Sequence, residues 1–213
     1  MPPGGKPYWG PLRLPAPPDG SLLIVRHAER DPVRTVAEAY GARLTETGRT
    51  MARKFGAQLG RRFRIGAALA SPVERCLETA QEILKGALNG SQPDPQNRDA
   101  KREPEVLPLD LLHFELKRTG IPGLETIFLD DLGFMRLVSQ PESSEYILLR
   151  RALLETLPFP QAPGVVNLAV THDVLITFLQ ASLLGLPKAS FEDFPDYLEG
   201  ICLVKHNNKV RLY

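Results

Sequence analysis

Cysteine is nearly absent from this sequence of 213 residues: only Cys76 and Cys202 occur, and they lie far apart. Two separated cysteines exclude a disulfide-rich scaffold and a cysteine-based zinc site. A chain of this length buries roughly two-thirds of its unfolded surface and needs neither to fold. We therefore interpret Cys76, on the apolar stripe of a predicted helix, as a small core residue.

An excess of charge of one sign is also absent, because 26 Lys and Arg residues balance 25 Asp and Glu residues at a net charge of +1. This balance argues against nucleic acid as a partner and against a polybasic membrane-binding surface. No run approaches the roughly 20 apolar residues that span a membrane. The N-terminus, MPPGGKPYWG, lacks the apolar core of a signal peptide, so a cytoplasmic protein is expected.

Proline, by contrast, is concentrated at the N-terminus. Seven of the first twenty residues are proline and four are glycine, which excludes a regular element there. We expect residues 1–20 to form an extended arm and residues 21–213 to form a single domain.

The remaining sequence alternates between short apolar runs and amphipathic segments. Strands are predicted at 21–25, 65–70 and 165–170, with two more around the Asn207-Asn208 turn. Helices are predicted at 47–62, from an N-cap at Ser71 to Gly86, at 124–138, at 143–157 and at 173–184. This order predicts an α/β fold with a mainly parallel sheet and helices on both faces. Residues 86–160, which begin with a polar loop to about 108, would form an insertion over one end of the sheet.

Polar motifs follow three of the predicted strands directly. The first strand leads into Arg26-His27-Ala28-Glu29-Arg30, the second into Ser71-Pro72-Val73-Glu74-Arg75, and the third into Thr171-His172-Asp173. Ligands bind outside the carboxyl ends of strands in open α/β sheets. If the three strands are neighbours, the following side chains converge on one site: Arg26, His27, Arg30, Arg75, His172 and Asp173.

Such a site is suited to phosphoryl transfer without a metal ion. Arginine presents forked donors that match a phosphate or a carboxylate. Histidine supplies a nucleophile or an acid–base group near neutral pH, and Asp173 supplies a proton donor. The arginines would take the role of magnesium in kinases. No HExxH, GxxxxGK[ST], GxGxxG or GxSxG motif occurs, so neither a metal nor a cofactor is expected.

Four segments, in order, resemble the motifs of the histidine phosphatase superfamily. RHAERDP is similar to its RHGxRxP signature, with Ala28 where glycine is commoner, and Leu44-Thr45-Glu46-Thr47-Gly48 is similar to its LTxxG segment. SPVERCLETA resembles SPxxRCxxTA, and His172-Asp173 resembles the His-Asp pair of the acid-phosphatase branch. The resemblance implies a three-layer, phosphoglycerate mutase-like fold with a lid insertion, closest to a small acid-phosphatase-type member.

The resemblance also implies a role for each residue. His27 would be the nucleophile that becomes phosphohistidine, and Asp173 would be the proton donor. The phosphoryl clamp would consist of Arg26, Arg30, Arg75 and His172. A histidine nucleophile must be held in one tautomer, and a backbone carbonyl near Leu44–Thr45 is our candidate for holding it.

Several alternatives stay open at this point. In the phosphoglycerate-mutase branch the proton donor follows the second arginine motif, where the candidates are Glu103, Glu105 and Asp110. The expected activity is hydrolysis of a small-molecule phosphomonoester. The alternatives are a phosphomutase or phosphotransferase and an inactive module that binds phosphate or phosphopeptides. The physiological substrate and the oligomeric state do not follow from the sequence.

Overall fold

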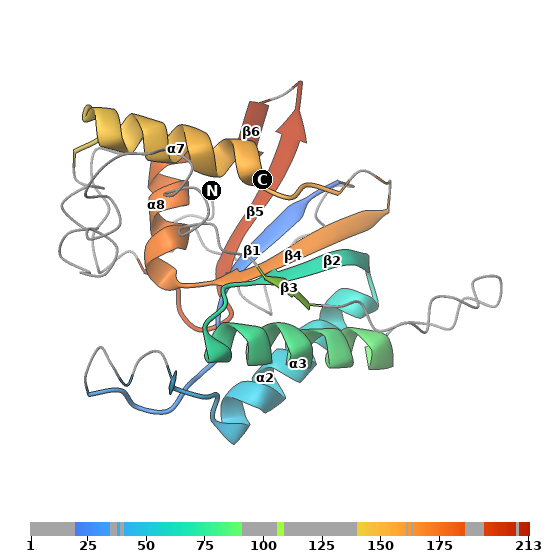
Figure 1. The fold of residues 1–213 in the computed structure, drawn as a ribbon. Coiled ribbons are helices and arrows are strands. Elements are labelled where there is room, and N and C mark those ends of the chain that lie inside the picture. Colours follow the sequence, from blue (N-terminus) through green and yellow to red (C-terminus); the bar gives the residue numbers. More distant parts are fainter. Residues whose placement is uncertain are drawn as a thin grey trace, which may run out of the picture.

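A mixed sheet of six strands in the order β3-β2-β4-β1-β5-β6 forms the centre of the fold (Figure 1). The computed structural model describes residues 20–34, 38, 41–90, 106–108, 140–160, 162, 164–185, 194–207 and 209–213. The strands, in chain order, are β1 Leu22–Arg26, β2 Arg64–Ala70, β3 Val106–Pro108, β4 Val165–Thr171, β5 Gly200–His206 and β6 Lys209–Leu212. The first four strands pair in parallel, and β5 and β6 pair antiparallel. The predicted α/β fold with a mainly parallel sheet is confirmed.

Helices cover both faces of this sheet, each burying its own apolar cluster (Figure 1). The helices are α2 Glu46–Gly60, α3 Glu74–Gly90, α7 Ser144–Thr156 and α8 Asp173–Leu184. On one face α2 and α3 pack through Phe55 and Ile83, and on the other α7 and α8 pack through Leu149 and Phe178. Strand β4 lies between β2 and β1 and is buried along its whole length, as a continuous apolar run predicts.

The α2 and α3 backbones approach each other closely because both helices carry glycine four residues apart. A Cβ atom on Gly56 would collide with the Ile83 carbonyl, and one on Gly86 would collide with the Arg53 carbonyl. Gly60 and Gly90 are equally restricted by the facing backbone. This contact packs α3, and therefore the arginine motif at its start, against α2, which begins within the LTETG segment.

Two sequence-based predictions about α3 are wrong. Ser71 does not cap the helix, which begins at Glu74, and the Val73 carbonyl accepts hydrogen bonds from the amides of Cys76 and Leu77. Ser71 instead stays at the end of β2, where its side chain turns toward His172. The helix also does not end at Gly86 but continues to Gly90, because packing on α2 favours glycine there.

The described parts of the predicted 86–160 insertion belong to the body of the domain. Residues Val106–Pro108 were expected to be loop, but they form the edge strand β3 beside β2. Helix α7 packs into the core through Tyr146, Leu149 and Leu153. The predicted helix at 124–138, the rest of the lid and residues 1–19 of the arm lie outside the described residues. Among the residues that are described, no helix has the length and apolarity needed to cross a membrane.

Candidate active site

The three polar motifs meet at one edge of the sheet because β2, β4 and β1 are neighbours in that order. Arg26 pairs with Thr171 across β1 and β4, and Ala70 pairs with Val170 across β2 and β4. The residues that follow these strand ends therefore lie side by side, as the parallel-sheet argument predicts. The edge brings together all six predicted side chains: Arg26, His27, Arg30, Arg75, His172 and Asp173.

His27 is held in a single tautomer. Its Nδ1 lies 2.8 Å from the Ala28 carbonyl oxygen, and because a carbonyl can only accept, Nδ1 must carry the proton. Nε2 is then the unprotonated nitrogen. The expectation that a carbonyl near Leu44–Thr45 orients this ring is wrong, because the next residue in the chain supplies the acceptor. The Leu44 amide instead donates to Glu78.

Both histidines are kept neutral. Burial lowers the pKa of His27 to about 2, although the Ala28 hydrogen bond opposes the shift, and the charge of Arg75 lowers it further. Burial also lowers the pKa of His172 to about 3, with Arg75, Arg26 and Arg30 adding to the effect. Burial and nearby cations both disfavour imidazolium. The two rings lie edge to face, with centroids 5.7 Å apart.

Ser71 and Arg75 orient His172. Arg75 Nη2 lies 3.2 Å from His172 Nδ1, and since a guanidinium can only donate, Nδ1 is the acceptor. Nε2 therefore carries the proton and lies 3.2 Å from Ser71 Oγ, which accepts it. The histidine thus joins the end of β2 to the first turn of α3.

Arg26 and Asp173 form an ion pair between the ends of β1 and β4. Arg26 Nη2 lies 2.7 Å from Asp173 Oδ2, and each side chain is 19% exposed. The second carboxylate oxygen, Oδ1, accepts a 2.8 Å hydrogen bond from the Val174 amide at the start of α8. The predicted proton donor therefore lies within the arginine cluster, which consists of Arg26, Arg30 and Arg75.

Two arginines of this cluster have side-chain donors that bind no acceptor among the described residues. Within the part of the chain that is described, the Nε atoms of Arg26 and Arg30 are buried and make no hydrogen bond. Burial, together with the charge of Arg30, lowers the pKa of Arg75. Buried cationic donors are costly when unpaired, so this arrangement is suited to an anion that accepts several hydrogen bonds.

The LTETG segment supports the loop that follows His27. Thr45 caps α2 by accepting from the Gly48 amide at 2.9 Å, and its hydroxyl donates to Glu29 Oε1 at 2.6 Å. A side chain at Gly48 would collide with the Glu29 carbonyl. Leu44 forms an isolated bridge with Arg30, so this segment determines where the Arg30 backbone lies.

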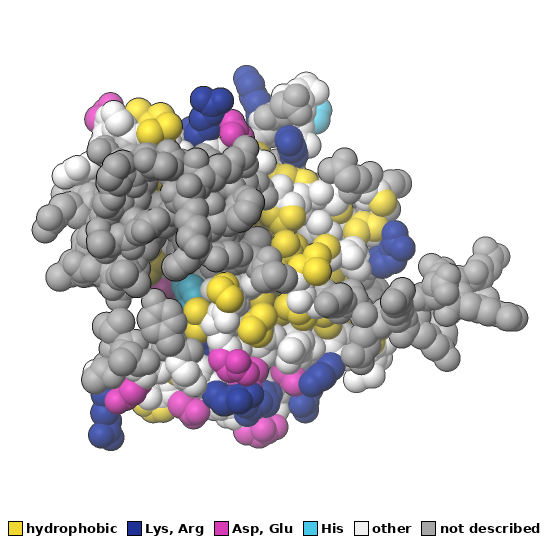
Figure 2. Space-filling view, viewed as in Figure 1, with side chains coloured by type: hydrophobic (Ala, Val, Ile, Leu, Met, Phe, Trp, Pro, Cys, Tyr) yellow, Lys and Arg dark blue, Asp and Glu magenta, His cyan; other side chains and the backbone are white. Residues whose placement is uncertain are grey.

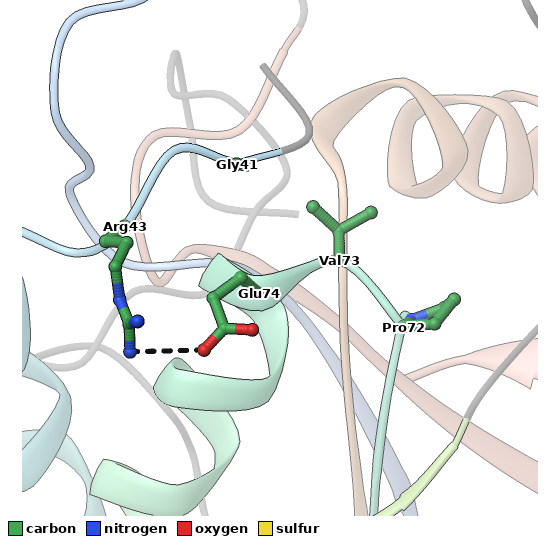
Figure 3. A pocket seen from close by; sticks show the side chains of 5 residues that line it. All are labelled: Gly41, Arg43, Pro72, Val73 and Glu74. Carbon is green, nitrogen blue, oxygen red and sulfur yellow. Dashed lines mark ion pairs between the residues drawn. The ribbon is translucent and has the colours of Figure 1, made fainter. Parts of the chain in front are cut away.

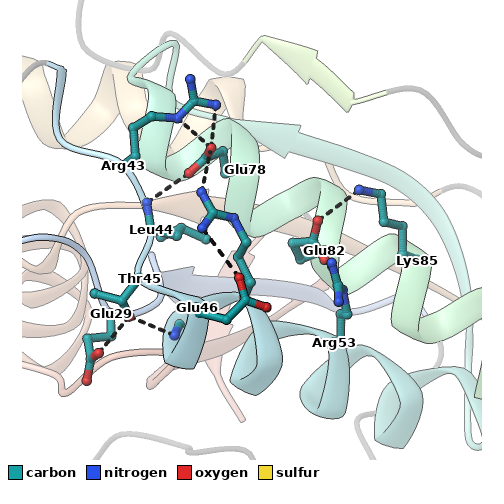
Figure 4. A network of polar contacts seen from close by, with 11 residues as sticks. Glu29, Arg43, Leu44, Thr45, Glu46, Arg53, Glu78, Glu82 and Lys85 are labelled. Carbon is teal, nitrogen blue, oxygen red and sulfur yellow. Dashed lines mark hydrogen bonds and ion pairs between the residues drawn. The ribbon is translucent and has the colours of Figure 1, made fainter.

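A buried carboxylate fastens this segment to α3 (Figure 4). Glu78 accepts hydrogen bonds from the Leu44 amide at 2.8 Å, from Arg43 and from Arg49. Burial alone would raise the pKa of Glu78, but these hydrogen bonds outweigh it and lower the pKa. A second carboxylate, Glu82, joins α3 to Arg53 in the same way. Figure 2 shows acidic and basic side chains intermixed over the α2 and α3 face.

A surface hollow of about 440 Å³ lies beside this network (Figure 3). It is lined by Gly41, Arg43, Pro72, Val73 and Glu74, and Arg43 and Glu74 pair across it at 3.1 Å. It contains none of the six clustered side chains. The exposed ion pair between Arg43 and Glu74 contributes little to the stability of the fold. Because the hollow holds neither histidine of the site, we assign the chemistry to the six clustered side chains instead.

Cys76 lies against the site but is chemically unsuited to it. Its Sγ is 3.8 Å from His172 Nε2, and its side chain is fully buried. Burial raises the pKa of the thiol to about 12, so thiolate is negligible near neutral pH. The interpretation of Cys76 as a core residue is consistent with this packing.

The neutral state of His27 predicts how stability changes with pH. Unfolding returns the pKa from about 2 to 6.5, so the unfolded chain binds an extra proton below pH 6.5. His27 therefore stabilises the fold above pH 6.5, and that contribution is lost progressively as pH falls toward 2. We expect the free energy of unfolding of the wild type, relative to His27→Gln, to fall by about 2 kcal/mol between pH 8 and pH 5.

Urea unfolding at several pH values in phosphate-free buffer measures this difference. His206→Gln, which removes an exposed histidine at the end of β5, is the control variant. A difference between wild type and His27→Gln that stays constant from pH 8 to pH 5 would contradict the assignment.

Two residues of the site were not anticipated from the sequence. Ser71 follows a predicted strand directly, and that position could have identified it had it not been interpreted as a helix cap. Tyr197 stacks on Arg26, and the centroid of its ring lies 5.7 Å from the centroid of the His27 ring. It belongs to no motif, and only the pairing of β5 with β1 brings it to the site.

Comparisons with known proteins agree with this arrangement. Residues 22–101 match the family model described as histidine phosphatase superfamily (branch 1). A search of curated proteins finds no significant sequence match. The matching family model describes branch 1 of the superfamily. The expected likeness of this chain to a small acid-phosphatase-type member therefore stays a prediction.

Several solved structures share the fold. Phosphoserine phosphatase from Entamoeba histolytica, solved with 3-phosphoglyceric acid, is 16% identical over 90% of this chain and 94% of its own, with a TM-score of 0.52. Phosphoglycerate mutase from Bacillus anthracis is 15% identical over 93% of each chain, with a TM-score of 0.52. Mycobacterial glucosyl-3-phosphoglycerate phosphatase, solved with inorganic phosphate, is 17% identical over 91% of this chain and 95% of its own, with a TM-score of 0.53. At these identities the likeness concerns the fold.

Proposed function

Because the chain belongs, through residues 22–101, to the histidine phosphatase superfamily, we propose that it hydrolyses phosphomonoesters without a metal ion, through a phosphohistidine on His27. One observation carries the proposal. His27 is a buried, neutral imidazole whose Nδ1 proton is held by the Ala28 carbonyl, which leaves the lone pair on Nε2 beside cationic arginines. A site that only bound phosphate would gain nothing from a neutral histidine in this position.

In the first step, His27 Nε2 attacks phosphorus, a P–N bond forms, and the P–O bond to the alcohol breaks. The imidazole becomes positively charged, and the hydrogen bond from Nδ1 to the Ala28 carbonyl stabilises that charge. Arg26, Arg30 and Arg75 neutralise the phosphoryl oxygens with donors already in place, and the bound anion relieves their mutual repulsion. These cations disfavour a metal ion in the same position.

In the second step, water attacks phosphorus and the P–N bond breaks. Inorganic phosphate leaves, and His27 returns to its neutral tautomer. The proton lost by the water goes to the carboxylate that protonated the alcohol in the first step.

Asp173 is our candidate for that carboxylate. In the ligand-free site Arg26 Nη2 binds Asp173 Oδ2, and Arg26 also has a buried Nε without an acceptor among the described residues. A phosphoryl group that drew Arg26 toward itself would free Asp173 to carry a proton. The alternative donors Glu103, Glu105 and Asp110 lie outside the described residues.

The proposal is tested by measuring hydrolysis of 4-nitrophenyl phosphate in excess EDTA. We expect turnover, and we expect an alkaline SDS quench of a reaction with radiolabelled phosphomonoester to trap protein-bound phosphate that is base-stable and acid-labile. Loss of activity in EDTA with recovery in a divalent metal would contradict the mechanism. Transfer of the label to an added alcohol in preference to water would favour a phosphotransferase or phosphomutase. Phosphate binding without turnover would favour a binding module.

The role of Asp173 is tested by the leaving group. Asp173→Asn cannot donate a proton, so we expect kcat to fall about 100-fold for an alkyl phosphate and far less for 4-nitrophenyl phosphate, whose leaving group needs little protonation. Glu142→Gln, at an exposed carboxylate, should change neither rate. An equal loss on both substrates would move the acid to another residue.

A further inference from the structure

The turn formed by residues 194–199, which precedes β5, makes three hydrogen bonds with Arg26. Arg26 Nη1 donates a 2.7 Å hydrogen bond to the Pro195 carbonyl. The Arg26 amide donates to the Glu199 carbonyl at 2.9 Å, and the Leu198 amide donates to the Arg26 carbonyl at 3.2 Å. Both the backbone and the side chain of this arginine therefore depend on one short segment, 169 residues away in sequence.

Within that turn, Tyr197 presents its ring to the guanidinium group. Arg26 Cζ lies 4.6 Å from the centroid of the Tyr197 ring, within the range of a cation–π interaction. The centroid of the same ring lies 5.7 Å from the centroid of the His27 ring, and the two ring planes meet at 45°. One aromatic side chain thus lies against both Arg26, the last residue of β1, and His27, which follows the strand.

The backbone after Tyr197 adopts an uncommon conformation. Leu198 has a φ of 61°, in the left-handed region that favours glycine, and its side chain is fully buried. Hydrogen bonds on both sides of it, from Leu198 to Arg26 and from Glu199 to Asp196, hold the turn in place. Backbone strain of this kind persists where the surrounding structure requires it, and it often marks a functional site.

These contacts determine the orientation of the guanidinium plane. Pro195 binds Nη1, Asp173 binds Nη2, and the Tyr197 ring covers one face. Nε–H is the buried donor with no acceptor among the described residues. A flat group with five donors needs such contacts, because a phosphoryl oxygen is recognised only when the donors point at it.

We propose that Tyr197 is a positioning residue, which holds the guanidinium of Arg26 through the face of its ring so that Arg26 can bind the phosphoryl group. The inference rests on the proposed phosphatase function. The ring, rather than the hydroxyl, carries the effect, because the ring contacts Arg26. The role differs from core packing, since the ring acts on a charge at the site.

The experiment compares Tyr197→Phe, Tyr197→Leu and pentafluorophenylalanine incorporated at position 197. The pentafluoro ring keeps the shape of phenylalanine, but its face no longer attracts a cation. We measure kcat/KM on 4-nitrophenyl phosphate and, independently of turnover, the Kd of inorganic phosphate by calorimetry. We expect Tyr197→Phe to remain within about threefold of wild type, and the other two variants to lose about 10–30-fold in both quantities.

A double-mutant cycle isolates the partner. In an Arg26→Gln background there is no guanidinium to orient, so Tyr197→Leu should cost less than about threefold in kcat/KM. Tyr213→Leu, at an exposed C-terminal tyrosine, is the matched control.

The result that would overturn the inference is a pentafluoro variant equal to Tyr197→Phe, or equal costs of Tyr197→Leu with and without Arg26. A Tyr197→Phe variant as poor as Tyr197→Leu would assign the effect to the hydroxyl and would also overturn it. A purely structural role would lower kcat through loss of folded protein and leave the phosphate Kd unchanged. If the wild type neither binds phosphate nor hydrolyses the substrate, the proposed function itself fails. The role of Tyr197 is tested separately, by the differences among variants of an active wild type.

Discussion

His27→Ala should lower kcat/KM on 4-nitrophenyl phosphate by about four orders of magnitude or more and should abolish the trapped phosphoenzyme. The expected loss is large because the imidazole forms the bond to phosphorus, and removing a nucleophile typically costs more than removing a residue that only stabilises the transition state. No other described side chain at the site can replace it: His172 Nε2 is protonated and donates to Ser71, and the Cys76 thiol has a pKa raised to about 12. Both alternatives are poor nucleophiles near neutral pH.

The measurement pairs steady-state kinetics with alkaline-quench labelling, with both reactions run at a single pH. His206→Ala, at an exposed histidine of β5, controls for the loss of an imidazole from the chain and should match the wild type in both readouts. An acid-labile phosphoenzyme that survives in His27→Ala would move the nucleophile to another residue. A variant that still binds inorganic phosphate while losing all turnover would agree with the proposed division of roles.

Arg75→Ala should lower kcat/KM by about 1,000-fold, the upper range for removing a donor that stabilises developing charge. Arg75 has two tasks in the proposed mechanism. It binds the phosphoryl oxygens, and its Nη2 holds His172 in the tautomer that donates from Nε2. Arg75→Lys keeps the charge but loses the planar fork, so we expect it to recover only part of the loss.

The same substitution should not destabilise the ligand-free fold. Burial and the charge of Arg30 lower the pKa of Arg75, which means that the folded protein holds this cation at a cost. We expect the free energy of unfolding without ligand to stay equal or rise, while the increase in Tm caused by inorganic phosphate disappears. Arg151→Ala, at an exposed residue of α7, should leave the phosphate effect intact. A large loss of ligand-free stability in Arg75→Ala would show that Arg75 is structural.

The main parts of the site could be predicted from the sequence because each depends on local patterns. Apolar runs identify β1, β2 and β4, and the residues after them are polar in a way that no core strand tolerates. A general property of parallel sheets then brings these ends to one edge. Local patterns and this property together predict that Arg26, His27, His172 and Asp173 lie at one site.

The start of α3 could not be predicted correctly for a physical reason. Ser71 followed by proline is a good local signal for a helix start. In the folded chain the His172 ring offers the Ser71 hydroxyl a hydrogen bond that an isolated helix could not provide. The tertiary contact therefore overrides the local preference. The same holds for Gly86, a common residue beyond a helix end, which instead packs within α3 against the α2 backbone.

The sequence by itself determined which residues follow the buried strands and which chemistry they can perform, because strand periodicity and side-chain type are encoded locally. Only the tertiary structure decided how those groups are held. The placement of β5 beside β1 brings Tyr197 and the Pro195 carbonyl to Arg26. Contacts between residues so distant in the chain depend on the whole sheet being assembled, and hydrophobic patterning carries no information about them.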